Sequence, residues 1–274
     1  MSIATTTDTD LLLDSLHDAY EYIPKRAIRY FIDPDHKAQA ATLLLTEMEE
    51  VLADPSFFAE DMSQFLFHAM MILGHLHEED AIPLFKKVGY LENHAVNEFL
   101  GSRLFDSVPH AFAELFKHRI DELKALIEDA GQNPMIRASQ LQTLMVLYGS
   151  GQLQREDLVS YFLTLLQNRK EKTPHIYDLI AAAATVLHPK EMIDELRAAY
   201  DEGYINPEQI ALSEIEEILD DPVEEFSDHA REAFHADLED LLAHYEKIMG
   251  KKHFFERNDP CPCCSGLKYK KCCY

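Results

Sequence analysis

Ile136-Arg-Ala-Ser-Gln-Leu-Gln-Thr-Leu-Met-Val-Leu-Tyr-Gly149 is the stretch that most directly indicates the fold. Asn133-Pro134 precedes it, which supplies a capping side chain and a proline suited to the first helical position. A short turn at Gly149-Ser-Gly151 follows it. Apolar residues recur at spacings of three and four on both sides of that turn: Leu141, Leu144, Met145 and Tyr148, then Leu158, Phe162, Leu165 and Leu166. This spacing predicts two amphipathic helices joined by a turn.

Two other stretches share this organisation, Phe65–Gly74 and Tyr177–Leu187. Leu147 and Leu187 are 40 residues apart, and Leu73 and Leu147 are 74 residues apart, which is nearly two such steps. Spacing of this kind is typical of stacked helical hairpins. The stretch 133–138 also loosely resembles the opening of the second helix of a HEAT-type repeat. We therefore expect an irregular HEAT-like α-solenoid, with a compact multi-helix bundle as the alternative.

The rest of the chain carries the same helical signals. Prolines follow capping residues, glycines stand where helices should end, and no strand-like alternation of useful length occurs. We expect an all-α fold with helices near 9–20, 24–32, 34–53, 57–76, 80–88, 91–100, 107–117, 120–130, 134–148, 155–169, 174–187, 190–201, 207–220 and 226–249.

Composition bounds the class of protein. The chain has 274 residues, 47% of them hydrophobic, which is enough to bury a substantial core. Its longest nearly apolar run, 179–187, is too short to cross a bilayer. The first ten residues lack the basic and apolar regions of a secretory signal, so the expected location is the cytoplasm.

The charge is unevenly distributed. Residues 250–274 carry six Lys or Arg and two acids, a net of +4, so residues 1–249 carry a net of −28. Such a body repels nucleic acid. Acidic residues are densest from Lys190 to Lys247. This segment is expected to form a solvated helix face, and a surface for a basic partner is the alternative.

All five cysteines lie in the last stretch, Arg257-Asn-Asp-Pro-Cys-Pro-Cys-Cys-Ser-Gly-Leu-Lys-Tyr-Lys-Lys-Cys-Cys-Tyr274. Cys261-x-Cys263 is followed after eight residues by Cys272-Cys273, a pattern typical of two ligand pairs on one metal. So short a segment has no core of its own, and four protein ligands leave no open coordination position. The pattern predicts a structural Zn²⁺ site, a small zinc knuckle, and a disulfide or unbound thiols are the alternative. We expect a helical-repeat domain at 1–225, a long amphipathic capping helix and linker at 226–256, and the zinc-binding tail at 257–274.

The tail resembles the SEC-C motif, the zinc module named for the C-terminus of the preprotein translocase ATPase SecA. The resemblance rests on Arg-Asn-Asp-Pro-Cys-Pro-Cys, Ser-Gly and Lys-Tyr-Lys-Lys-Cys-Cys, and it covers the tail alone. It implies that the metal ligands are Cys261, Cys263, Cys272 and Cys273. The family usually has glycine where this chain has Cys264, which leaves Cys264 as a competing ligand.

The resemblance also implies a partner surface. In the translocase the motif's basic residues dock on the acidic export chaperone SecB, and related tails contact ribosomes. The matching residues here are Arg257, Lys268, Tyr269, Lys270 and Lys271. Contact with a chaperone, the translocation machinery or the ribosome is expected, with ribosomal RNA as the nucleic acid that the tail could bind. The alternative is that the tail folds back on the protein's own acidic body.

No set of residues in the body matches a catalytic motif. His75-Leu-His77-Glu78 lacks the second histidine of a zinc helix, Glu232-Ala-Phe-His235 is the only Glu-x-x-His, and Ser150 lies in a turn between two helices. Body and tail together resemble uncharacterised bacterial proteins that end in a SEC-C motif. The function expected is that of a non-catalytic interaction adaptor, and the alternative is an enzyme with a cryptic active site and the tail as a targeting tag.

Overall fold

The computed structural model describes residues 6–19, 22–56, 63–169, 174–223, 241–249, 257–261 and 266–272. Within these ranges every regular element is helical, apart from one antiparallel bridge between Pro260 and Lys268, which confirms the all-α class. None of the helices described there has both the length and the apolar character needed to cross a membrane. The chain divides into unit 1, Met1–Leu115 with Asp237–Tyr274, and unit 2, Phe116–Ala236.

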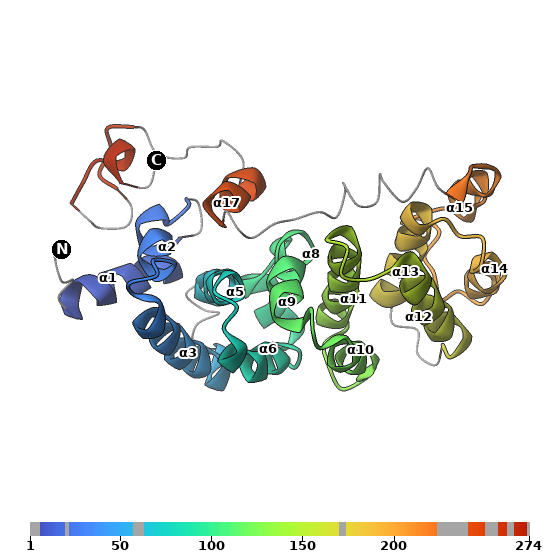
Figure 1. Ribbon diagram of the computed structural model, residues 1–274, viewed down its shortest axis with the longest axis horizontal. Coiled ribbons are helices and arrows are strands. Elements are labelled where there is room, and N and C mark those ends of the chain that lie inside the picture. Colours follow the sequence, from blue (N-terminus) through green and yellow to red (C-terminus); the bar gives the residue numbers. More distant parts are fainter. Residues whose placement is uncertain are drawn as a thin grey trace. The chain divides into compact units, whose positions relative to one another are not determined.

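Unit 1 is built from helices of the N-terminal half and from the C-terminal segment (Figure 1). Its elements are α1 (Thr6–His17), α2 (Lys25–Phe31), α3 (Lys37–Ala53), α5 (Phe65–His75), η1 (Glu79–Ala81), α6 (Ile82–Val88), α7 (Asn93–Phe99), α8 (Arg103–Asp106), α9 (Val108–Phe116, whose last residue falls in unit 2), α17 (Leu241–Met249) and η3 (Tyr269–Lys271).

Helix α5 is the centre of unit 1. Every residue from Phe65 to Gly74 is buried, and the helix packs against α1, α3, α7 and α17. A helix that is apolar on all sides is stable only when neighbours cover each side. The backbones of α5 and α9 approach closely, because a Cβ atom at Gly74 would lie 2.9 Å from the Ala111 Cα atom. Glycine is therefore required at that crossing.

Unit 2 contains α10 (Ile120–Glu128), α11 (Pro134–Gly149), α12 (Arg155–Gln167), α13 (Pro174–Leu187), α14 (Ile193–Asp201), α15 (Leu212–Glu217) and η2 (Ile218–Asp220). Helix α11 packs against α10, α12 and α13; α13 packs against α12 and α15, and α14 packs against α12 and α15 (Figure 1). Helix α11 is the central helix here, since its residues are buried on all sides.

The sequence prediction for α11 is confirmed at its start. The Asn133 side chain accepts a hydrogen bond from the Met135 N–H at 2.9 Å, and Pro134 is the first helical residue. This is the capping arrangement expected from the Asn-Pro pair.

Other Asx-Pro pairs behave differently from the prediction. The Asp33 carboxylate accepts from the Asp35 N–H at 2.9 Å and the Asn206 side chain accepts from the Glu208 N–H at 3.0 Å, yet turns follow both. Helices begin only at Lys37 and Leu212, so starts at 34 and 207 were wrong. The same local hydrogen bond closes an Asx turn as readily as it caps a helix.

Two further differences concern unit 1. Ser63 and Gln64 are not helical, so the helix expected at 57–76 begins instead at Phe65; residues 57–62 lie outside the described ranges. The short helix α8 was not expected. The predicted domain limits after 225 and 256 also fall on residues that the structure does not describe.

Candidate functional site

The C-terminal tail forms a tight backbone hairpin. The Cys261 N–H donates to the Leu267 carbonyl at 2.8 Å, the Tyr269 N–H donates to the Asp259 carbonyl at 2.8 Å, and the Lys270 N–H donates to the Arg257 carbonyl at 3.0 Å. Gly266 has φ of +72°, a left-handed conformation that glycine adopts without strain. These bonds set residues 257–261 directly against residues 267–270.

The hairpin brings two predicted metal ligands to one place. Cys261 is 4% exposed and lies in a buried cluster with Tyr269, and Cys272 packs against the same cluster. Cys272 follows the 3₁₀ turn η3, where its N–H donates to the Tyr269 carbonyl at 3.0 Å. Two thiols held on one side of a hairpin fit the soft donor set that Zn²⁺ prefers.

Cys263, Cys273 and the atypical Cys264 lie outside the described residues. Among the residues that are described, no group of three or more metal-binding side chains occurs, and only two of the four predicted ligands lie in those ranges. The full ligand set therefore stays a prediction.

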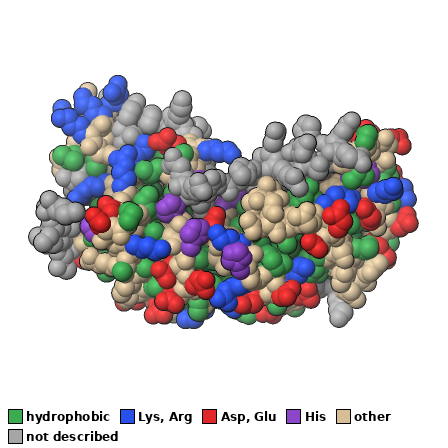
Figure 2. Space-filling model, in the orientation of Figure 1, with side chains coloured by type: hydrophobic (Ala, Val, Ile, Leu, Met, Phe, Trp, Pro, Cys, Tyr) green, Lys and Arg blue, Asp and Glu red, His purple; other side chains and the backbone are tan. Residues whose placement is uncertain are grey.

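The basic residues of the tail differ from the cluster in their exposure. Arg257, Lys268, Lys270 and Lys271 are all exposed. Figure 2 shows Lys and Arg side chains gathered over the tail. Tyr269 differs from them because it is 4% exposed and points into the cluster with Cys261. The described part of the tail thus combines exposed basic side chains with the buried side chains of Cys261 and Tyr269, which we call its inward face.

The inward face contacts the connection between α1 and α2. Ala19 and Tyr22 are 0% and 4% exposed and complete the cluster with Cys261 and Tyr269. The Tyr22 hydroxyl donates to the Ser15 carbonyl at 3.4 Å. Tail and body thus contact each other within unit 1 through apolar packing, whereas the alternative drawn from the sequence was a contact of the tail with the acidic body through charge.

Helix α17 joins the C-terminal segment to α5. Leu241 and Tyr245, both in the predicted apolar stripe, are 1% and 0% exposed. The Tyr245 hydroxyl donates to His68 Nδ1 at 2.8 Å, and His68 Nε2–H donates to the Ala19 carbonyl at 3.4 Å. The predicted helix 226–249 lies outside the described residues over 226–240.

Three histidines in or near α17 have pKa values lowered by burial. Complete burial, with Arg103 nearby, lowers the pKa of His68 from 6.5 to about 3. Burial and the neighbouring His244 lower the pKa of His110 to about 3. Burial and Lys247 lower the pKa of His244 to about 4, and the rings of His110 and His244 lie 5.2 Å apart. The sequence analysis considered His75, His77 and His235 instead, and nothing in the local sequence distinguishes His68, His110 and His244.

A hydrogen-bonded chain of Ser63, His17 and Glu47 was also missed. His17 Nδ1 lies 2.8 Å from Ser63 Oγ, and His17 Nε2 lies 3.0 Å from Glu47 Oε1. Ser63 is 4% exposed, and its Oγ also accepts the Phe65 N–H at 3.2 Å. The chain links α1, α3 and the start of α5.

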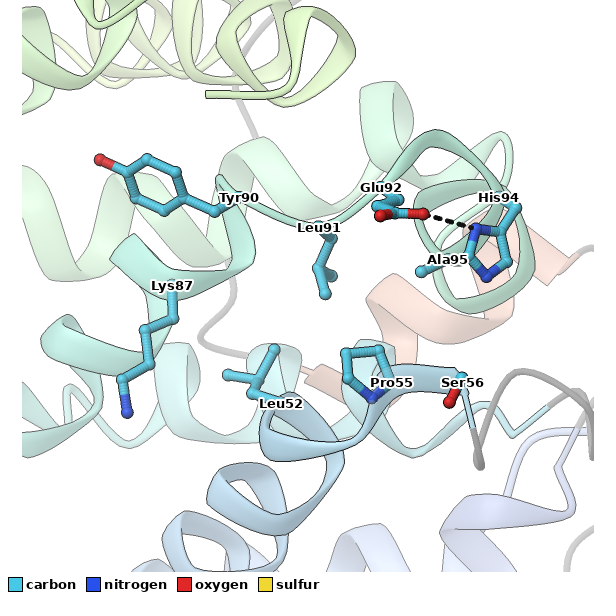
Figure 3. A pocket seen from close by; sticks show the side chains of 9 residues that line it. All are labelled: Leu52, Pro55, Ser56, Lys87, Tyr90, Leu91, Glu92, His94 and Ala95. Atoms are coloured by element: carbon cyan, nitrogen blue, oxygen red, sulfur yellow. Dashed lines mark ion pairs between the residues drawn. The ribbon is translucent and has the colours of Figure 1, made fainter. Parts of the chain in front are cut away.

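Unit 1 also contains a pocket of about 430 Å³. Figure 3 shows apolar side chains of Leu52, Pro55 and Leu91 within it. Tyr90 and Lys87 lie on one side. Glu92 and His94 lie on another, where Glu92 Oε2 is 3.6 Å from His94 Nδ1. Because the charges at the rim have both signs, the pocket favours neither anions nor cations.

Comparison with known proteins identifies both regions. An uncharacterized protein of Chlamydia trachomatis is 28% identical over 216 residues, covering 78% of this chain and 85% of that protein. One of Chlamydia muridarum is 28% identical over 199 residues, covering 72% and 79%. No solved structure matches the chain. The SEC-C motif model matches residues 257–274.

A second family model, described as "Protein of unknown function (DUF1186)", matches residues 8–252, almost the whole body. The chain therefore belongs to the DUF1186 family and ends in a SEC-C motif.

Proposed function

We propose that this protein is a non-catalytic interaction adaptor whose zinc-structured tail docks on an acidic protein partner. The observation that carries the proposal is a contrast within the tail: four basic residues are exposed, while Cys261 and Tyr269 are buried. A surface of this kind attracts acidic partners through charge. Partners in the export chaperone or translocation machinery fit it, and ribosomal RNA is the competing outcome.

The metal is a structural Zn²⁺ held by Cys261, Cys263, Cys272 and Cys273. Bound there, the ion supplies the folding free energy that so small a segment cannot obtain from a core, on the order of 10–16 kcal/mol in zinc-finger peptides. A reducing compartment such as the cytoplasm keeps the thiols available to the ion. Cys261 and Cys272 are the two ligands whose side chains approach one cluster.

The contact residues proposed are Arg257, Lys268, Lys270 and Lys271. Tyr269 was predicted with them, but its burial suits it to an anchor within this chain. The helical body supplies the second surface of the adaptor. We propose that it is an irregular solenoid, supported by the rows that α11, α13 and α15 form on one side and α12 and α14 on the other.

Charge reversal in the tail tests this function. The variant Lys270→Glu/Lys271→Glu should lose partners that the intact protein captures from bacterial lysate, and binding should weaken with added salt. The control is Lys87→Glu/Lys190→Glu, which changes the net charge equally at two exposed positions of the body. Equal capture by both variants would rule out the tail as the docking surface, and nuclease-sensitive capture would favour RNA over an acidic protein.

The alternative is an enzyme with a cryptic active site, and the Ser63–His17–Glu47 chain is the observation that favours it. Its distances suit a hydroxyl activated by a histidine. Burial of Ser63 argues against a nucleophile open to substrate. Labelling by a fluorophosphonate probe that is lost in Ser63→Ala would favour the enzyme over the adaptor.

A further inference from the structure

The inward face of the tail contacts a surface formed by another part of unit 1. We call this surface the α1–α2 corner and define it by Ala19 and Tyr22, between the end of α1 and the start of α2. Both residues are buried in the cluster with Cys261 and Tyr269. The cluster is thus built half from the corner and half from the tail.

The described part of the tail supplies only two of the buried side chains of this cluster. Of the tail residues that the structure describes, only Cys261 and Tyr269 are buried, and Leu267 is 47% exposed. Two side chains make no core, so the burial of Cys261 and Tyr269 depends on Ala19 and Tyr22. An aromatic residue such as Tyr269 contributes a large apolar area to a contact of this kind.

The corner is also held from its other side. The Ala19 carbonyl accepts from His68 of α5 at 3.4 Å, and Lys25 Nζ donates to Glu246 of α17 at 2.7 Å. The Tyr22 hydroxyl bonds back to Ser15 of α1. Because these contacts fix the corner in place, it presents a preformed surface to the tail.

The thiols belong to the same contact. Cys261 is itself part of the cluster and Cys272 packs against it, so these two of the side chains assigned to the metal belong to the contact with the corner. A ligand that binds only the ordered state of a segment stabilises whatever else that order requires. Metal binding would order the tail, and the ordered tail buries Tyr22. These two processes are therefore coupled.

We propose that the α1–α2 corner is an internal binding site for the metal-loaded tail, so that metal binding at the tail stabilises the N-terminal helices of unit 1. This inference rests on the metal site of the proposed function. Docking through Tyr269 leaves Lys268, Lys270 and Lys271 exposed.

Hydrogen exchange of the full chain with Zn²⁺ and with a chelator tests the proposal, with the zinc content measured in parallel. Amides of residues 6–31 should exchange about tenfold or more slowly with Zn²⁺, because their opening then requires release of the tail. Stoichiometric zinc with unchanged exchange in 6–31 would overturn the inference and leave the adaptor intact. Absence of bound zinc would overturn both this inference and the zinc-structured adaptor of the proposed function.

Matched variants separate docking from metal binding. Tyr269→Ala should keep its zinc but lose the zinc-dependent protection of residues 6–31, and Leu267→Ala is the control that should keep both. Tyr22→Ala changes the corner while leaving the tail sequence untouched, and it should likewise retain zinc and lose the response. Full protection in both Tyr22→Ala and Tyr269→Ala would show that the cluster does not couple them.

Discussion

Helices α5 and α11 are both largely buried and both contain polar residues, yet they satisfy those residues in different ways. In α11, Arg137 donates to Ile127 at 2.7 Å, ten residues away, and Thr143 donates to Ser139, four residues away. In α5, His68 pairs with Tyr245, 177 residues away. Buried polar groups need partners, so α5 depends on a distant segment where α11 depends on its own neighbourhood. Unit 1 is therefore sensitive to the C-terminal segment in a way that unit 2 is not.

The largest expected effect comes from Tyr245→Ala. It removes a fully buried aromatic ring and leaves His68 without its donor, at a cost of about 3–5 kcal/mol in the free energy of unfolding. Hydrogen exchange should accelerate in α1, α5 and α17 and stay unchanged in α11 and α13. Equal acceleration in both units would contradict the difference between the two helices.

Acid should have the next largest effect, and on unit 1. The folded state keeps His68 neutral down to about pH 3, whereas the unfolded chain takes up its proton near 6.5. Below pH 6.5 protons therefore favour unfolding. The stability that neutral His68 contributes is complete above that pH and is lost as the pH falls. At pH 5 His68 alone lowers stability by about 2 kcal/mol.

Urea unfolding of the full chain between pH 7 and 4 measures this loss of stability. Hydrogen exchange within each unit assigns the loss to unit 1 or unit 2. His110 and His244 add to it in the same direction because their pKa values are also lowered. The variant His68→Asn removes one titrating group and should flatten the pH dependence. A stability of unit 1 that does not change over this range would refute the assignment of neutral histidines.

Tyr245→Phe isolates the hydrogen bond from the packing. The ring is kept, and His68 Nδ1 is left buried without a donor, which costs about 1–3 kcal/mol. Chemical denaturation of wild type and variant gives the difference. A cost as large as that of Tyr245→Ala would mean that the hydrogen bond accounts for the whole contribution of this side chain.

Thr143→Val tests the other side of the comparison. Its hydroxyl only supplements the α11 backbone by donating to the Ser139 carbonyl at 3.1 Å, so its removal should change the free energy of unfolding by less than about 1 kcal/mol. The same denaturation experiment measures it. A loss as great as that of Tyr245→Phe would show that local bonds in α11 matter as much as the distant bond in α5.

The contrast also explains what the sequence could predict. Helix α13 begins and ends at the predicted residues, 174 and 187, and α11 differs by one residue, because helical period and capping are local properties. The pairing of His68 with Tyr245 joins residues far apart in the chain, and no local pattern records it. In the tail, cysteine spacing predicted that Cys261 and Cys272 would share one site. The inward direction of Tyr269 depends on Tyr22, which lies at the other end of the sequence.

Gly74 gives the crossing of α5 and α9 an additional role. His110 immediately precedes Ala111, the residue that Gly74 approaches, and His110 faces His244 of α17. Any side chain at Gly74 would move α9 outward and take His110 with it. A side chain at Gly74 would therefore disturb the contact between His110 and His244 of α17 from a crossing of two other helices.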